Sequence, residues 1–179
     1  MKKILTALFL IIIGGVNSYA CRCEDPGSIQ EAYNYTETIL QGSVLSKSFV
    51  TFKSTMNEAQ ISLLNEKFKD NPQRLSLMES EFVIKIELKI TNVYKGEIKN
   101  DTVIIYTTRT GVSCGYTGFE TGREYLIYTS SRSHMYAFFD SNANEEKLEL
   151  ENTFWTNHCT RTMVYNRKEA KELKKLANK

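Results

Sequence analysis

Histidine is scarce in this sequence, and motifs of the kind that carry enzymatic chemistry are missing. The chain has two histidines, His134 and His158, fewer than a histidine metal centre needs, and each is better explained as an ordinary surface or packed residue. No metal-binding motif or nucleophilic triad can be recognised. We therefore expect no catalytic residues, no cofactor or metal of the protein's own, and no enzymatic activity.

An excess of charge of one sign is also missing. The chain carries 23 basic and 21 acidic residues, and this difference disappears if Lys2 and Lys3 are removed with an N-terminal leader. The basic residues between 161 and 179 are interleaved with Glu169 and Glu172 at helical spacing, which is typical of a solvated helix face. A general attraction to nucleic acid or to anionic membranes is therefore not expected.

Long apolar runs are absent except near the N-terminus. Two lysines precede a nearly unbroken apolar run over residues 4–13, and Ser18 and Ala20 are small residues at the positions that a signal peptidase reads. Residues 1–20 are therefore predicted to be a signal peptide, and we expect a secreted protein, extracellular or periplasmic. A membrane anchor is disfavoured because the run is shorter than the roughly 20 residues that a bilayer core requires.

Cleavage after Ala20 would make Cys21 the first residue of the mature chain. A cysteine at this position is also where lipoproteins carry their acyl chains, but that signal usually has a leucine-like residue where Ser18 stands and a small one where Tyr19 stands. A lipid anchor at Cys21 is therefore the less favoured alternative. The remaining residues, 21–179, are enough for one domain and short for two.

The chain has few cysteines, and their number is even. They are Cys21, Cys23, Cys114 and Cys159. In an exported chain this count predicts two disulfides, with three pairings open. A bond between Cys21 and Cys23 is the least favoured, because it would close a strained ring. A metal site of four thiolates is the alternative, but such sites usually show two close pairs, and here two of the cysteines stand alone.

Most of the chain between the cysteines has the composition of β-strands. Four segments are rich in β-branched and aromatic residues with partial alternation, and a fifth is shorter. These segments are 38–50, 82–94, 102–107, 124–129 and, as the short fifth, 135–139. Gly42 lies inside the first of them, which indicates a bulge or sharp coil.

Two further segments have helical patterns. Residues 55–80 are charged and place Ile61, Leu64 and Phe68 at helix-like spacing, so we expect a long, partly helical insertion between the first two strands. It is either a second contact surface or a tolerated loop, and if it is peripheral, its deletion should leave the barrel folded. Residues 169–179 predict an amphipathic C-terminal helix. Together the elements predict a mainly β protein, a five-stranded Greek-key barrel of the OB type.

Several short motifs, in this order, resemble one family. They are Cys21-Arg-Cys23 directly after a signal peptide, Gly42-Ser-Val44, Val93-Tyr-Lys-Gly96, Cys114-Gly-Tyr116 followed by Tyr125-Leu-Ile-Tyr128, and a late Cys159 before a C-terminal helix. The mature chain thus resembles the netrin-like domain, specifically the N-terminal domain of tissue inhibitors of metalloproteinases. The resemblance implies an OB barrel with disulfides between Cys21 and Cys114 and between Cys23 and Cys159.

The resemblance also implies a mechanism, with an extracellular zinc metalloprotease as the partner. The α-amine and the carbonyl oxygen of Cys21 would chelate the catalytic zinc of the protease, and so Cys21 would contact a metal in the complex only. Residues 21–24 would enter the protease cleft, with Arg22 beside the zinc. Val112 and Ser113 would form a second ridge alongside.

The sequence departs from the family pattern at two of these positions. Family members carry a small residue where Arg22 stands and an apolar residue where Glu24 stands. A cation is costly to place in a deep apolar pocket unless an acidic group meets it. The alternative function is therefore a secreted netrin-like interaction module that binds a partner without inhibiting a protease.

Overall fold

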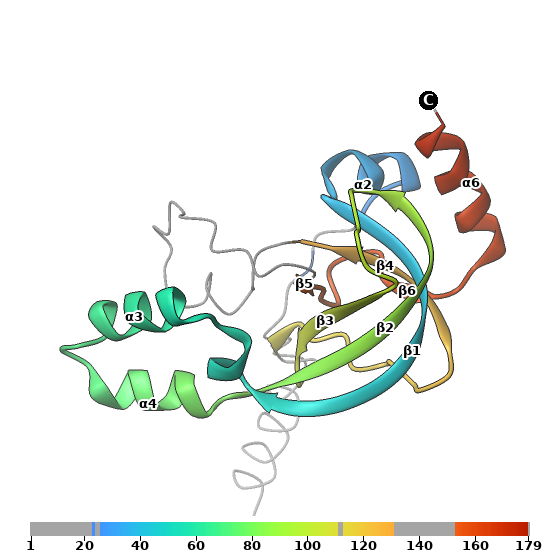
Figure 1. The fold of residues 1–179 in the computed structure, drawn as a ribbon. Helices are drawn as coiled ribbons and strands as arrows, with labels where there is room; N and C mark the ends of the chain where they lie inside the picture. Colours follow the sequence, from blue (N-terminus) through green and yellow to red (C-terminus); the bar gives the residue numbers. More distant parts are fainter. Residues whose placement is uncertain (1–22, 24–25, 111–112, 131–152, 179) are drawn as a thin grey trace, which may run out of the picture.

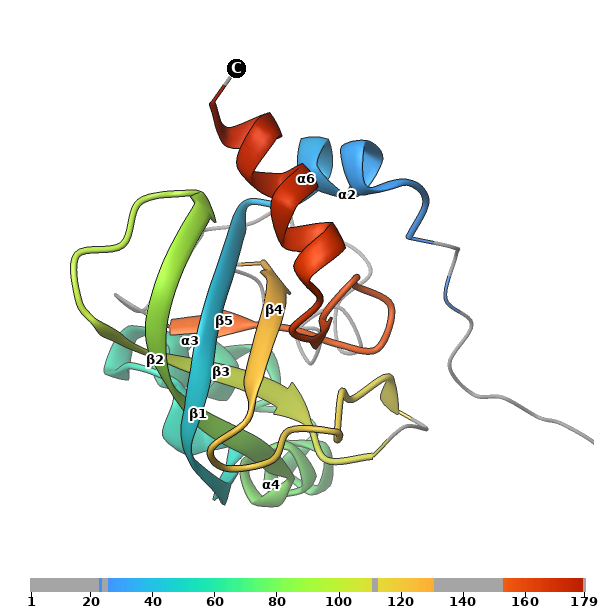
Figure 2. The same ribbon diagram turned by 90° about the vertical axis from the view of Figure 1, so that its right-hand side faces the viewer.

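A computed structural model of the chain describes Cys23 and residues 26–110, 113–130 and 153–178. Among these residues the fold is a strongly curved β-sheet with helices at both ends (Figures 1 and 2). The expected signal peptide, residues 1–20, lies outside the described part of the chain. Within that part, no helix is both long enough and apolar enough to cross a membrane.

The sheet has six strands in the order β5-β3-β2-β1-β4-β6. The four long strands are those expected from the sequence, and all of their mutual pairings are antiparallel. They are β1 (Thr38–Thr51), β2 (Phe82–Lys95), β3 (Thr102–Thr108) and β4 (Glu124–Thr129). Two short outer strands, β5 (Thr153–Trp155) and β6 (Met163–Val164), were not expected.

The predicted number of strands therefore needs correction, whereas the strand pairings of the described residues do not by themselves show a closed barrel. The described residues form a mixed α/β structure with a six-stranded sheet, which agrees with the predicted mainly β character in coarse form. The predicted short strand at 135–139 lies outside the described residues. The strand β5 is parallel to β3, and its Trp155 also makes an isolated antiparallel bridge to Ser130, just after β4.

The strand β4 is buried along nearly its whole length because it is covered on both faces. Tyr125 and Ile127 contribute to the central core, whereas Leu126 and Tyr128 pack beneath the helices α2 (Ile29–Tyr35) and α6 (Arg167–Ala177). A strand with two buried faces has an unbroken apolar sequence, as this segment does. Both helices lie at one end of the sheet (Figure 2).

Gly42 occupies the close strand contact that the sequence indicated. The β1–β2 register shifts between Gln41 and Gly42, and a Cβ atom on Gly42 would lie 2.5 Å from the carbonyl oxygen of Lys89. Only glycine fits without moving the neighbouring backbone. The bulge predicted in this strand is confirmed.

The insertion between β1 and β2 is helical but not peripheral. It contains the short 3-10 turn η1 (Phe52–Thr55) and the helices α3 (Glu58–Lys67) and α4 (Pro72–Ser80). Its side chains form a second core with the sheet residues Val83, Tyr106 and Trp155. The predicted segment 55–80 contributes Leu64, Phe68 and Met78, and Phe52 of η1, just before it, joins them. The segment is therefore not peripheral, and the condition under which its deletion would leave the sheet folded does not hold.

Two neighbouring residues of α4 test this correction. Met78 is 1% exposed within the second core, whereas Leu77 is 70% exposed. We expect Met78→Ala to lower the free energy of unfolding by about 2–3 kcal/mol, at the low end for buried methionine because a short helix can shift to fill the space. Leu77→Ala, the control, should leave it within about 0.5 kcal/mol of the native value in urea denaturation. Equal effects from both variants would show that the helices do not pack on the sheet.

Candidate functional site

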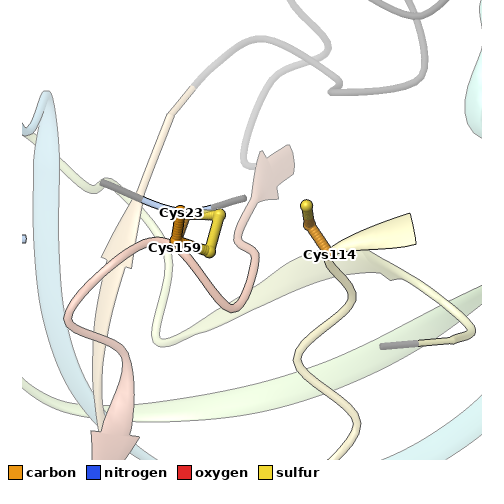
Figure 3. A group of neighbouring side chains, drawn as sticks. All are labelled: Cys23, Cys114 and Cys159. Atoms are coloured by element: carbon orange, nitrogen blue, oxygen red, sulfur yellow. A yellow bond between two sulfur atoms is a disulfide. The ribbon is translucent and has the colours of Figure 1, made fainter. Parts of the chain in front are cut away.

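Three separate segments meet at a cluster of sulfur atoms (Figure 3). Cys23 is joined to Cys159 by a disulfide, with 5.0 Å between their Cα atoms. The sulfur of Cys114, which is also disulfide-bonded, lies within 4.8 Å of both of theirs. The bond between Cys23 and Cys159 is the one that the resemblance implied. Because these sulfurs form disulfides, they are not the free thiolates that the alternative metal site would need.

The segment after β3 reaches the cluster through a tight turn. Cys114 has a φ of +60°, a left-handed conformation that is uncommon for a residue with a side chain. Hydrogen bonds hold the turn from both sides: the N–H of Gly115 donates to the carbonyl of Thr110 at 2.8 Å, and the hydroxyl of Thr108 donates to the carbonyl of Ser113 at 2.7 Å. These two bonds connect Ser113 and Gly115, on either side of Cys114, to the end of β3 and the residues just after it.

Gly115 is required for this turn on steric grounds. A Cβ atom at this position would lie 1.9 Å from the carbonyl oxygen of Thr108, whereas one on Gly118 would meet nothing closer than 3.6 Å. We expect Gly115→Ala to displace the turn and to cost about 1–3 kcal/mol of stability. Gly118→Ala is the matched control and should unfold at the native temperature. Calorimetry of both variants would contradict the steric argument if the two melted alike.

The segment after β5 carries Cys159 to the same place. The side-chain carboxamide oxygen of Asn157 accepts the N–H groups of Cys159 at 2.8 Å and Thr160 at 3.0 Å, a local turn that asparagine favours. The N–H of His158 donates to the carbonyl of Cys114 at 2.7 Å. The two segments that carry Cys114 and Cys159 are thus joined by a backbone hydrogen bond, and their sulfur atoms also lie close together.

A buried ion pair supplies a second attachment for the N-terminal segment. The guanidinium of Arg161 donates to the carbonyl of Gly27 at 2.7 Å and makes two hydrogen bonds to the Glu169 carboxylate, at 3.1 and 2.8 Å. The hydroxyl of Tyr128 donates to the same carboxylate at 2.7 Å. The chain near Cys23 is therefore attached both to the loop after β5 and, through Arg161, to α6.

Hydrogen bonding to Glu169 and burial shift the pKa values of Arg161 and Tyr128. The hydrogen bond to Glu169 raises the pKa of Arg161, so the guanidinium stays charged. Burial, together with the neighbouring carboxylate, raises the pKa of Tyr128 well above its usual value. Tyr128 is therefore held neutral, with a proton to donate to Glu169.

The structure describes two of the six residues predicted to contact a protease. Cys23 and Ser113 are brought to the same cluster, with the Ser113 hydroxyl 2.9 Å from that of Thr110. The others, Cys21, Arg22, Glu24 and Val112, lie outside the described residues. Cys21 is also the residue expected to contact zinc and to pair with Cys114.

Three residues that shape the site were not singled out from the sequence. Asn157, two residues before Cys159, fits the turn preference of asparagine and could have been noticed. The interpretation of residues 161–179 as a solvated helix face was wrong at Glu169, whose side chain is 7% exposed and pairs with Arg161. The spacing did not indicate this, because the further partners Gly27 and Tyr128 are remote in sequence. Compared with models of known protein families and with curated protein sequences, the chain finds no match in either, so the family resemblance rests on the motifs alone.

Proposed function

We propose that this protein is a secreted inhibitor of zinc metalloendopeptidases, resembling the N-terminal domain of the tissue inhibitors. One observation carries the proposal: Cys23 is bonded to Cys159 within 4.8 Å of the Cys114 sulfur. An extended segment preceding Cys23 would therefore emerge beside the turn at Ser113. This supports the two adjacent ridges that docking into a protease cleft requires.

In this proposal the zinc ligands are the amine and carbonyl oxygen of Cys21, exposed by cleavage after Ala20. An α-amino group has a pKa of about 8, so it loses its proton readily beside a metal ion. A catalytic zinc keeps one coordination position for water, which a five-membered chelate can displace.

Two attachments near the inhibitory segment support this mechanism energetically. The disulfide at Cys23 and the hydrogen bond from Arg161 to Gly27 hold the chain before any partner binds. A segment ordered in advance loses less conformational entropy on docking. Arg22 would then enter the pocket beside the zinc, and we propose that the target protease carries an acidic group there to meet this charge.

We further propose that the curved sheet is a barrel of the OB type. The parallel pairing of β3 with β5 and the bridge from Trp155 to Ser130 place β5 between β3 and the end of β4. The N–H of Thr156 donates to Tyr106 in β3 and its hydroxyl to Tyr128 in β4. These contacts support closure through the segment that carries Cys159.

The proposed function is tested by adding one alanine before Cys21. An amide would replace the amine and could not donate a lone pair to zinc, while the sheet and the disulfides could still form. We expect the native protein to inhibit one or more members of a panel of extracellular zinc proteases, and the extended protein to lose at least about 100-fold in affinity.

The thermal midpoint of the extended protein is the control, and it should equal that of the native protein. Mass spectrometry of the exported protein would first verify that Cys21 is the unmodified N-terminus. If the native protein inhibits no protease, or if the extended one inhibits equally well, zinc chelation is excluded and the alternative of a netrin-like interaction module takes its place.

A further inference from the structure

The sulfur cluster brings two disulfides within reach of each other. Cys23 and Cys159 form one bond, and Cys114 takes part in another. All three sulfurs lie within 4.8 Å of one another (Figure 3). A disulfide bond is about 2 Å long, so the Cys114 sulfur would have to move by less than about 3 Å to bond to either neighbour.

The geometry points to a thiol–disulfide exchange centre at this cluster, whose co-reactant is a dithiol reductant. The reductant first cleaves the bond made by Cys114 and is itself oxidised to a disulfide. Its two electrons and two protons leave both Cys114 and the cysteine previously bonded to it as thiols. The Cys114 thiolate then attacks the Cys23–Cys159 bond. The exchange replaces the Cys23–Cys159 disulfide by a disulfide to Cys114. The Cys23–Cys159 bond is therefore broken without a second molecule of reductant.

The second step conserves electrons. When the Cys114 thiolate attacks the sulfur of Cys159, a Cys114–Cys159 bond forms, and the Cys23–Cys159 bond breaks with its electron pair leaving on Cys23. Cys23 then takes a proton from water. Attack on Cys23 instead releases Cys159 in the same way. In both products the direct bond between Cys23 and the loop after β5 is lost.

The surrounding backbone supports a short path for the attack. The carbonyl of Cys114 accepts the N–H of His158, the residue next to Cys159, so the two loops stay together when a sulfur bond is broken. The Asn157 turn also holds the N–H of Cys159 in place. An attacking thiolate that is already positioned reacts as an intramolecular partner.

This centre would regulate the proposed inhibitory segment, and that consequence rests on the proposed function. Exchange onto Cys159 breaks the direct bond from Cys23 to the loop after β5, while the hydrogen bond from Arg161 to Gly27 is kept. The exchange reaction itself does not depend on what the protein inhibits. A secreted dithiol oxidoreductase is the class of partner that would drive it.

Partial reduction followed by disulfide mapping tests the exchange. The native protein is treated with limiting dithiothreitol, quenched with acid at timed intervals, alkylated and digested for mass spectrometry. We expect the singly reduced protein to carry a disulfide between Cys114 and either Cys159 or Cys23. The alkylation label should then lie on the cysteine displaced from Cys23–Cys159 and on the former partner of Cys114. A singly reduced protein that keeps Cys23–Cys159 intact and stays labelled at Cys114 would overturn the inference.

A matched variant tests the role of Cys114 as the attacking group. Cys21→Ser combined with Cys114→Ser removes Cys114 and the partner that the resemblance implies, while Cys23–Cys159 remains. The remaining bond should then be reduced at least about tenfold more slowly than in the native protein; an unchanged rate would contradict intramolecular attack. If the variant does not fold, the mapping of the native protein decides.

These measurements need no protease, so the inference and the proposed function can fail separately. If exchange is observed but no protease is inhibited, only the proposed function is contradicted. If a protease is inhibited but no exchange is observed, only the proposal of an exchange centre is contradicted. If both hold, protein treated to the singly reduced state should inhibit more weakly than the native protein.

Discussion

Replacing Glu169 by alanine is expected to lower the free energy of unfolding by about 3–5 kcal/mol. The Glu169 side chain is only 7% exposed and the Arg161 side chain 19% exposed. Removing the carboxylate leaves the guanidinium largely buried without its counter-charge, and leaves the hydroxyl of Tyr128 without its acceptor. Loss of these interactions should exceed the effect of any exposed ion pair in the protein.

Glu172, three residues later on the same helix, supplies the matched control. Its carboxylate pairs with Lys175 at 2.8 Å in solvent, where the pair is screened by water. Glu172→Ala should therefore leave the urea midpoint unchanged, and if Glu169→Ala behaved in the same way, the ion pair would not be buried in solution.

A double variant separates the buried charge from the packing. Arg161→Met with Glu169→Leu removes both charges and keeps apolar volume, so it should be more stable than Glu169→Ala alone. It would still lose the hydrogen bond to Gly27. If the double variant were the less stable of the two, the attraction between Arg161 and Glu169 would exceed the free energy needed to remove both charges from water.

The main strands could be predicted because the composition of each segment is by itself enough to indicate a strand. Residues in β1 to β4 are rich in β-branched and aromatic side chains, and the turns between them carry glycines such as Gly96 and Gly122, both at positive φ. The C-terminal helix was equally plain, since Ala170 and Leu173 lie on one buried face. These features depend on local preference and on burial of one face, which the sequence records directly.

The elements that were missed depend on partners elsewhere in the chain. The strand β6 has two residues and exists through its pairing with Tyr125 and Leu126 of β4. Helix α2 has only seven residues, although Ser28 and Glu31 form the capping box that marks its start. Short elements such as these have little periodicity, so tertiary contacts decide whether they form.

The insertion shows how a correct local pattern leaves open what the segment packs against. The spacing of Leu64 and Phe68 correctly indicated helix, and both are buried. Their partners are Val83, Tyr106 and Trp155, which also lie in apolar segments, but nothing in the sequence connects the two groups. A contact between a helix and a sheet far away along the chain is not recorded in the periodicity of either.

The candidate site was predictable to a similar extent. The cysteines and the residues beside them were predicted to form the site, and the family resemblance implied which cysteines form disulfides with each other. The position of Arg161 against Gly27, across 134 residues, could not be inferred, because one charged residue before a basic helix is ordinary in sequence. Its importance comes from the carboxylate and carbonyl that the fold places around it.

Removing the Cys23–Cys159 disulfide should have the other large effect. The bond spans 136 residues, and its main contribution is to restrict the unfolded chain. If Cys114 is paired with Cys21, as the resemblance implies, that bond shortens the loop closed by Cys23–Cys159 to about 47 residues. The expected cost of Cys23→Ser with Cys159→Ser is therefore about 4 kcal/mol, below the roughly 5 kcal/mol of an isolated loop of the full length.

The same double variant would test the disulfide as an attachment of the inhibitory segment. At a temperature where the variant is still fully folded, the hydrogen bond from Arg161 to Gly27 remains, but Cys23 is released. We expect inhibition to weaken under these conditions, because the segment must then be ordered on binding. Chemical denaturation and inhibition are measured on the same preparation. A melting temperature within about 2 °C of the native value would contradict the loop-entropy argument, and native inhibition by the folded variant would show that the Arg161 attachment is sufficient to position the N-terminus.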